Sequence, residues 1–237
     1  MVQFAPNRYS PQWFESFHVP IPDARTKLEA DFVCFFAPLP DFRRIADVCC
    51  GMGRHSRALA KRGYQVNGID RDAAALAKAY QLGGGPRYIQ ADLRDYCLAP
   101  SDYDAVIIMG QSFGHFDTGT NISILERLST GLRIHGRMLL DLWNPDFFAS
   151  RQGERSLPIA DGIVRETKYI EDDRLFVHLS YPTGDEEDFE WQLFTRENIE
   201  ALAGSLALRL IACCADFDGS TVPSTSQPRI QFVLERV

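Results

Sequence analysis

Long hydrophobic runs are missing from this sequence. Across its 237 residues, no apolar stretch approaches the roughly 18 residues that a membrane-spanning helix requires. The N-terminal segment carries Asn7 and Arg8 but no signal-like apolar core. We therefore expect no membrane association and a cytoplasmic location, where thiols stay reduced.

A Cys-x-x-Cys spacing is also absent. Six cysteines occur, and four of them form the adjacent pairs 49–50 and 213–214, which is not the spacing of a zinc or redox centre. Most of them stand in apolar stretches, where a thiol packs as a small hydrophobe. The acidic run 185–188 has nothing to orient its carboxylates inward, so it predicts a solvated turn. We expect no metal site.

The sequence also lacks an excess of positive charge. The net charge of −7 disfavours a nucleic-acid partner that is held through its phosphates. Hydrophobic residues make up 45% of the chain, as in ordinary globular domains, and 237 residues suffice for one well-buried domain with an insertion. A small organic molecule is the favoured partner, and protein substrates remain open.

The clearest positive feature is the stretch 45–60. An apolar run closes on Gly51 and Gly53, and a helical pattern starts at once, which predicts a buried strand, a tight turn and a helix. The new helix would present its free N–H groups to a ligand above the strand. A second apolar run, 64–69, ends on Asp70, where a βαβ unit binds a ribose hydroxyl pair. This order predicts a nucleoside site.

Three alternatives compete with that interpretation. A lone Gly-x-Gly is common, and Asp70 is also suited to cap the helix that follows it. An NAD(P)-dependent Rossmann oxidoreductase would place a third glycine at position 56, where this chain has Ser56, and no Tyr-x-x-x-Lys pair for hydride transfer is present. A non-catalytic protein that only binds the cofactor would keep the same nucleoside residues.

Other predicted loops should share an edge with the glycine turn, because ligands of an open parallel sheet bind outside the carboxyl ends of its strands. Asp92 follows the short strand 87–90, and its carboxylate could accept a hydrogen bond from an exocyclic amine. Residues 110–117 follow the apolar strand 103–109, and residues 141–148 follow the next strand. Both loops combine polar and aromatic side chains, as an acceptor pocket requires.

His115 is the candidate general base in the first of these loops. An imidazole titrates near neutral pH and can take a proton from an amine or a hydroxyl nucleophile. The alternative is that His115 stands in the pocket wall and only shapes it. A neutral amine acceptor needs no base, whereas a hydroxyl acceptor does.

The motif at 47–53, Asp-Val-Cys-Cys-Gly-Met-Gly, resembles the Asp-x-Gly-x-Gly-x-Gly motif of class I S-adenosylmethionine-dependent methyltransferases, with Cys49 at the first glycine. Asp70 matches the acid of their second motif, and residues 90–93 match the third. The resemblance covers residues 40–145 and is closest to the small-molecule branch of the family. It implies methyl transfer from S-adenosylmethionine to a nitrogen or oxygen nucleophile of a small molecule.

The resemblance also implies which residues hold the two ligands. Gly51 and Gly53 would pass close to the methionine portion, Asp70 would bind the ribose, and Asp92 with Leu93 would hold the adenine. The full cofactor set is Asp47, Cys49, Gly51, Gly53, Arg54, His55, Asp70, Arg71, Asp92, Leu93, Met109, Gly110 and Gln111. The acceptor set is Phe17, Ser112, Phe113, His115, Phe116, Trp143 and Asn144.

The predicted fold class is α/β, a three-layer Rossmann-like sheet of seven mostly parallel strands with a terminal antiparallel hairpin. Aromatic residues before the first strand are expected to fold over the cofactor as a lid. Three successive strands without helices indicate a small antiparallel insertion, either a cap over the substrate or the surface of a homodimer. The single domain, 1–237, comprises a lid and helix (1–40), a cofactor-binding core (41–148), the insertion (160–194), and a closing helix and hairpin (195–237).

Overall fold

A computed structural model describes residues 7–18 and 21–237, and a seven-stranded sheet forms its centre. Strands β1 to β5 run parallel, and β11 is antiparallel to both of its neighbours, so the predicted class and terminal hairpin are confirmed. In spatial order the strands are β10 (Leu208–Cys214), β11 (Arg229–Arg236), β5 (Leu132–Trp143), β4 (Tyr103–Ile108), β1 (Arg44–Val48), β2 (Gln65–Asp70) and β3 (Arg87–Gln90).

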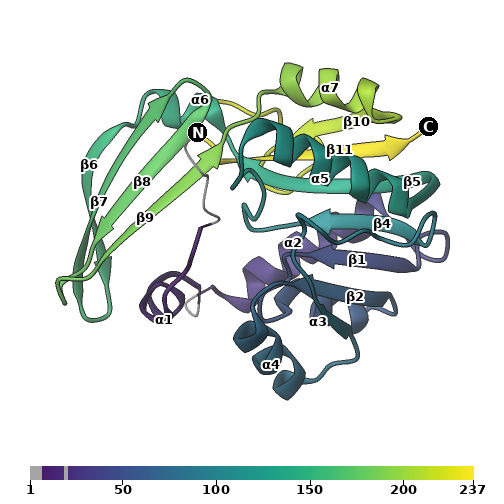
Figure 1. Ribbon diagram of the computed structural model, residues 1–237, viewed down its shortest axis with the longest axis horizontal. Helices are drawn as coiled ribbons and strands as arrows, with labels where there is room; N and C mark the ends of the chain where they lie inside the picture. The colour runs from purple at the N-terminus through teal and green to yellow at the C-terminus, as the bar shows by residue number, and fades with distance from the viewer. Residues whose placement is uncertain (1–6, 19–20) are drawn as a thin grey trace.

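Helices cover both faces of this sheet (Figure 1). All six residues of β4 are buried, as expected of a central parallel strand between two helical layers. Alternate residues serve the two layers: Ile45 and Ile107 pack with α2 and α3, whereas Ala46 and Val106 pack with α5 and α7. The helices are α2 (Asp23–Phe36), α3 (Arg54–Ala60), α4 (Ala73–Leu82), α5 (Thr118–Gly131), α6 (Pro145–Ala149) and α7 (Arg196–Ser205). Among the described helices, none is long and apolar enough to cross a membrane.

A second, four-stranded antiparallel sheet stands beside the first (Figure 1). Its strands, in spatial order, are β6 (Gly153–Ile159), β7 (Gly162–Glu171), β8 (Arg174–Ser180) and β9 (Glu186–Gln192). The sequence predicted three strands within 160–194, so β6 was missed. β6 is an exposed edge strand that contains Pro158, and it therefore lacks the alternation of apolar residues that marks a half-buried strand.

Asp185, Glu186 and Asp188 of the acidic run are exposed, as predicted, but the prediction of a turn was wrong beyond Asp185. Residues 186–188 open β9, and alternation along the strand brings the side chain of Glu187 to the inner side. Its carboxylate accepts hydrogen bonds from the backbone N–H of Ser10, at 2.9 Å, and from the hydroxyl of Tyr181. The run therefore connects the second sheet to the N-terminal segment.

The N-terminal segment 7–18 lies against β9. Its short helix α1 (Pro11–Trp13) continues into a π-helical turn, Phe14–His18. The ring of Tyr9 stacks on that of Phe189, with centroids 5.1 Å apart. The rest of the segment expected to form the lid, residues 1–6 and 19–20, lies outside the described residues.

Candidate cofactor and acceptor site

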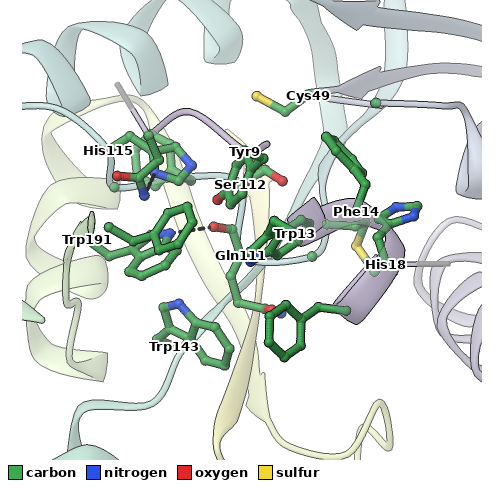
Figure 2. Close-up of a pocket in the computed structure, with 18 of the residues that line it drawn as sticks. Tyr9, Trp13, Phe14, His18, Cys49, Gln111, Ser112, His115, Trp143 and Trp191 are labelled. Atoms are coloured by element: carbon green, nitrogen blue, oxygen red, sulfur yellow. Dashed lines mark hydrogen bonds between the residues drawn. The ribbon is translucent and has the colours of Figure 1, made fainter. Parts of the chain in front are cut away.

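A cavity of about 1460 Å³ lies at the carboxyl ends of β1, β2 and β4 and continues along the second sheet. Figure 2 shows side chains from the N-terminal segment, from the loop after β4 and from the second sheet converging on it. Pockets for drug-sized ligands occupy roughly 300–1,000 Å³, so this cavity has room for a nucleoside cofactor and a second molecule.

The turn after β1 takes three left-handed backbone conformations in five residues, with φ of +59° at Cys49, +53° at Gly51 and +71° at Gly53. A Cβ added at Gly51 would meet no atom within 4 Å, and this residue lines the cavity. A Cβ at Gly53 would lie 2.2 Å from the hydroxyl oxygen of Tyr88. Gly51 thus leaves space for a ligand, whereas Gly53 allows the turn to pack on Tyr88.

Asp70 closes the same turn from the end of β2. Its two carboxylate oxygens accept the backbone N–H groups of Gly51, at 2.7 Å, and of Asp72, at 2.9 Å. Burial raises the pKa of Asp70, and the two backbone hydrogen bonds oppose that shift. Because a carboxylate offers about four acceptor positions, two of them remain for a pair of ligand hydroxyls.

Asp92 lines the cavity beyond β3 and is paired with its near neighbour Arg94. The guanidinium donates to both carboxylate oxygens, at 3.1 and 2.8 Å, and the backbone N–H of Arg94 donates at 2.9 Å. The hydrogen bonds from Arg94 hold the pKa of Asp92 below its usual range. Asp92 therefore faces the cavity as a carboxylate, with Leu93 beside it as an apolar surface.

Eleven of the thirteen predicted cofactor residues line the cavity, whereas Asp47 and Gly53 do not. Asp47 is buried, and its carboxylate accepts a hydrogen bond from the hydroxyl of Ser56 in α3. It therefore joins β1 to α3 beneath the turn. The lining residues are Cys49, Gly51, Arg54, His55, Asp70, Arg71, Asp92, Leu93, Met109, Gly110 and Gln111.

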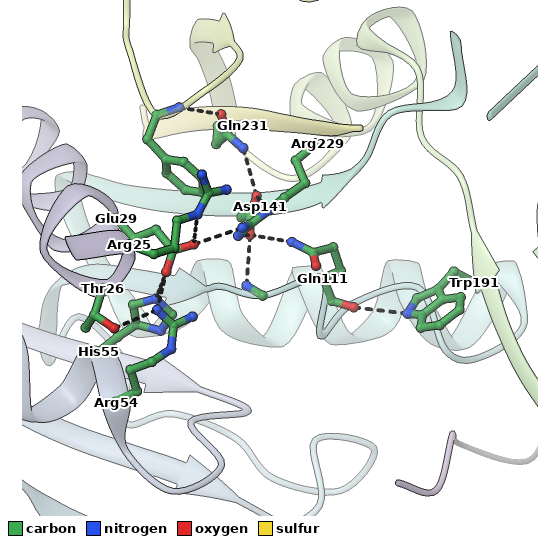
Figure 3. A network of polar contacts seen from close by, with 12 residues as sticks. Arg25, Thr26, Glu29, Arg54, His55, Gln111, Asp141, Trp191, Arg229 and Gln231 are labelled. Atoms are coloured by element: carbon green, nitrogen blue, oxygen red, sulfur yellow. Dashed lines mark hydrogen bonds and ion pairs between the residues drawn. The ribbon is translucent and has the colours of Figure 1, made fainter. Parts of the chain in front are cut away.

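A buried ion-pair network supports the base of the cavity (Figure 3). Arg229 of β11 donates to Glu29 of α2 at 2.9 Å and to Asp141 of β5 at 3.0 Å. Asp141 in turn accepts the backbone N–H of Gly110, at 2.9 Å, and the side-chain amide of Gln111, at 2.8 Å. The network thereby holds the loop that follows β4 in one conformation.

Glu29 also anchors the helix that follows the glycine turn. Arg54 and His55, both in the first turn of α3, contact its carboxylate, with His55 Nε2 at 2.8 Å. No local pattern predicts this network, because Glu29 and Arg229 lie 200 positions apart. Arg54 and His55 were predicted as cofactor residues, and their side chains serve this network at the cavity wall.

His115 is held by Asn7 of the N-terminal segment. The Asn7 side-chain amide makes two hydrogen bonds with the backbone of Glu190. Its Nδ2 donates to the Glu190 carbonyl at 3.0 Å, and its Oδ1 accepts from the Glu190 N–H at 2.9 Å. This pairing determines the orientation of the amide. Nδ2 also lies 2.8 Å from Nδ1 of His115, which must therefore be the acceptor.

The neutral ring of His115 consequently carries its proton on Nε2. Burial and the charge of Arg71 lower the pKa of His115 to about 4, so the ring is neutral at pH 7. In this tautomer His115 offers the cavity a hydrogen-bond donor. This geometry favours the alternative role of His115, in which it only shapes the pocket, over the predicted role of general base.

The low pKa of His115 makes the stability of the fold depend on pH. Its pKa is about 4 in the folded protein against an ordinary value of 6.5, so the unfolded chain binds one more proton between these values. The free energy of unfolding should therefore fall by up to about 1.4 kcal/mol per pH unit as the pH drops through this window. Replacing His115 with Gln removes this proton uptake, so the free energy of unfolding should depend less steeply on pH.

Urea unfolding at pH 7, 6 and 5 measures that slope in both proteins. His18, whose pKa burial also lowers to about 4, contributes equally to both and serves as an internal reference. An identical slope in the variant would contradict the assignment of a neutral, buried His115.

Aromatic side chains form the wall opposite the glycine turn. The indole N–H of Trp191 in β9 donates to the backbone oxygen of Gln111 at 3.0 Å and so connects the second sheet to the loop after β4 (Figure 2). Trp143 and Trp191 pack edge to face, with centroids 5.9 Å apart. Sequence reasoning missed Trp191, although the alternation of residues 187–191 was an available signal.

Six of the seven predicted acceptor residues line the cavity, namely Phe17, Ser112, Phe113, His115, Phe116 and Trp143. Asn144 is buried instead and serves the fold. Its Oδ1 accepts the backbone N–H of Asp146 at the start of α6, and its Nδ2 donates to the backbone oxygens of Ser224 and Gln227. Asn144 therefore caps a helix and holds the loop before β11.

The comparison with known proteins identifies the family. Residues 45–136 match the family model of the methyltransferase domain. The solved structure of CalS10 with S-adenosylmethionine bound, an amino pentose methyltransferase from Micromonospora echinaspora, superposes with a TM-score of 0.73 at 20% identity, covering 98% of this chain and 100% of its own. The domain match and the shared fold support a class I S-adenosylmethionine-dependent methyltransferase. Of the interpretations that the sequence left open, the methyltransferase is thus confirmed.

Two sequence relatives of this methyltransferase support the family. YqeM of Bacillus subtilis, a predicted methyltransferase, is 28% identical over 84% of this chain and 87% of its own length. The dTDP-3-amino-3,6-dideoxy-alpha-D-glucopyranose N,N-dimethyltransferase of Streptomyces fradiae is 27% identical over 68% of each chain.

Alanine at Gly53 of the methyltransferase should lower the free energy of unfolding by about 2 kcal/mol. A left-handed backbone costs a non-glycine residue roughly 1–3 kcal/mol, and the new Cβ would also have to displace the ring of Tyr88. Alanine at Gly51 carries the same backbone cost, but its Cβ would extend into open cavity. Gly51→Ala should therefore weaken cofactor binding, which calorimetric titration with S-adenosylhomocysteine measures. If Gly51→Ala binds like the wild type, Gly51 is not in contact with the cofactor.

Proposed function

We propose that this methyltransferase acts on the amine nitrogen of a small-molecule acceptor. The observation that carries the proposal is the tautomer of His115, which presents a proton to the cavity and takes none. The carboxylates that line the described part of the cavity are engaged in ion pairs or backbone hydrogen bonds; they are Glu29, Asp70, Asp72, Asp92 and Glu166. A neutral amine needs no base at the moment of transfer, whereas a hydroxyl does.

The residues of the cavity fit the cofactor. When it is bound, S-adenosylmethionine supplies an electrophilic methyl group on a sulfonium, and the protein has to bind, align and exclude water. Asp70 would accept the two ribose hydroxyls, and Gly51 would leave room for the methionine portion. Asp92 and Leu93 would hold the adenine.

The position of the acceptor would be set by the loop after β4. Asp141 holds Gly110 and Gln111, and Trp191 fixes the backbone of Gln111 from the other side. The N-terminal segment would act as the lid, since Asn7 joins β9 and His115 and so separates the cavity from solvent. Rigid support on both sides of this loop suits an in-line transfer, which depends on alignment.

The relatives are consistent with an amine acceptor. The Streptomyces fradiae protein is named as an N,N-dimethyltransferase of an amino sugar nucleotide, and CalS10 as an amino pentose methyltransferase. Aromatic and aliphatic side chains make up most of the wall beyond the loop after β4, as pockets for small organic molecules do.

Transfer of tritium from labelled S-adenosylmethionine to a panel of small amines and their matched alcohols tests this proposal. We expect label in one or more amines and none in the alcohols that correspond to them. Transfer to the alcohols alone would overturn the assignment to nitrogen. Calorimetric titration with S-adenosylmethionine and S-adenosylhomocysteine, and with NADH as the control, verifies the cofactor site independently of any acceptor.

The variant His115→Gln tests the role of the imidazole. Glutamine keeps one donor and one acceptor, so methylation of an amine should fall less than about tenfold. Loss of a true general base costs typically 10²–10⁴-fold in rate. A loss of that size, with cofactor affinity unchanged, would show that His115 takes the proton from the acceptor.

A further inference from the structure

The inner face of the second sheet lines the far part of the cavity and is mostly apolar. Leu157, Leu175, Val177, Leu179, Phe189 and Trp191 stand on it. Glu187 also stands on this face, where it binds Ser10 and Tyr181. The charged side chains that line the cavity here form a group of three on neighbouring strands, Arg155 of β6 with Glu166 and Lys168 of β7. Arg155 and Glu166 are directly opposite each other in the ladder, and Lys168 follows on the same face two residues later.

These three side chains share one carboxylate between two cations. Arg155 donates to both oxygens of Glu166, with Nη2 at 3.0 Å from Oε1. The ammonium of Lys168 lies 2.6 Å from Oε2 of the same group. The hydrogen bonds from Arg155 and Lys168 hold the pKa of Glu166 below its usual range despite its burial. The group therefore carries a net charge of +1 on an apolar wall.

Lys168 is the member of this group whose hydrogen-bond donors are not all used. Its residue is only 4% exposed, yet within the described residues its ammonium donates to the single acceptor Glu166. An ammonium has three donors, and the ring of Phe148, whose centroid lies 5.4 Å from Nζ, gives only a weaker electrostatic contact. A buried cation with unused donors is costly unless an anion or water completes its contacts.

We propose that Lys168, with Arg155, binds an anionic group of the acceptor, such as a carboxylate or a phosphate. This inference rests on the proposed function and deepens it: the acceptor would be an amine that carries a negative charge. The anion would lie against the second sheet, and the amine would point toward the loop after β4, because one continuous cavity joins the two places. The aromatic wall between them would contact the acceptor's carbon skeleton.

A matched pair of fluorescent probes tests the subsite without knowledge of the acceptor. The two probes, 8-anilinonaphthalene-1-sulfonate and N-phenyl-1-naphthylamine, share their aromatic rings and differ by one sulfonate. In the presence of S-adenosylhomocysteine, we expect the sulfonate probe to bind about 10- to 100-fold more tightly than the neutral one, the range for a hydrogen-bonded charge. Competition by inorganic phosphate or by acetate then distinguishes the two sources of charge.

The variant Lys168→Met should abolish the preference for the sulfonate and leave binding of the neutral probe unchanged. Glu166 keeps Arg155 as its partner in this variant, so the fold should tolerate it. Lys27→Met removes the same charge from the exposed surface of α2 and is the matched control. Arg155→Met, whose side chain is half exposed, provides a second variant with a smaller expected loss.

Equal binding of both probes to the wild type, or an unchanged preference in Lys168→Met, would overturn the anion subsite. Affinity for S-adenosylhomocysteine, measured on the same samples, should be the same in every variant. If the preference for the sulfonate probe is absent but S-adenosylhomocysteine binds normally, the anion subsite is wrong and the methyltransferase assignment stands. Anion binding together with methyl transfer to the alcohols alone would instead refute the proposed choice of nitrogen.

Discussion

Replacing Arg229 with methionine should lower the free energy of unfolding by about 3–5 kcal/mol. The side chains of Glu29 and Asp141 are fully buried, and Arg229 is the cation placed between them. Removing one member of a buried ion-pair network leaves an uncompensated charge, and that penalty exceeds the value of the lost contacts. In this network two carboxylates lose their shared partner at once.

Urea unfolding at pH 7 measures this loss, and Arg209→Met is the matched control. Arg209 pairs with Glu235 on the surface, where its side chain is 65% exposed, so its removal should cost less than about 1 kcal/mol. A loss of similar size in both variants would show that the buried network contributes no more to stability than a surface pair.

The effect of Arg229→Met should also depend on pH. Although burial opposes it, the hydrogen bond from His55 and the charges of Arg229 and Arg54 hold the pKa of Glu29 far below its ordinary value of 4.5. A carboxylate whose pKa is depressed on folding contributes stability above its unfolded pKa and loses it as the pH falls. The difference between wild type and variant should therefore shrink below about pH 4.5.

Alanine at Asp70 should weaken the binding of S-adenosylhomocysteine by about 1.5–3 kcal/mol, or roughly 10- to 100-fold in Kd. The carboxylate would accept both ribose hydroxyls, and it also holds the N–H of Gly51, so its loss both removes ligand contacts and loosens the turn. Isothermal titration calorimetry measures the change.

Asp102→Ala is the control for that measurement. Asp102 precedes β4 at the opposite edge of the sheet, where it pairs with Arg44 at 2.9 Å and is half exposed. Its removal should leave Kd unchanged. Unchanged affinity in a correctly folded Asp70→Ala protein would mean that the cofactor binds elsewhere.

Local patterns accounted for most of the core of the fold. The apolar run of β4, the glycine turn after β1 and the acid at the end of β2 each follow from residues close together in the chain. A period of two, a left-handed turn and a helix start are short-range signals, so a sequence can show them without its tertiary partners. The parallel topology then brings the carboxyl ends of these strands to one edge, which places most of the predicted cofactor residues around one cavity.

The contacts that shape the acceptor side depend on partners far apart in sequence. Asn7 meets His115 across 108 positions and thereby decides which nitrogen of the imidazole carries the proton. β6 has no alternating pattern of its own, and only its pairing with β7 places Arg155 beside Glu166. The sequence by itself determined the fold class and the cofactor motif, because these rest on local periodicity. The tertiary structure decided the ion-pair network, the state of His115 and the charge on the far wall, because burial and hydrogen-bond partners exist only once distant segments have packed together.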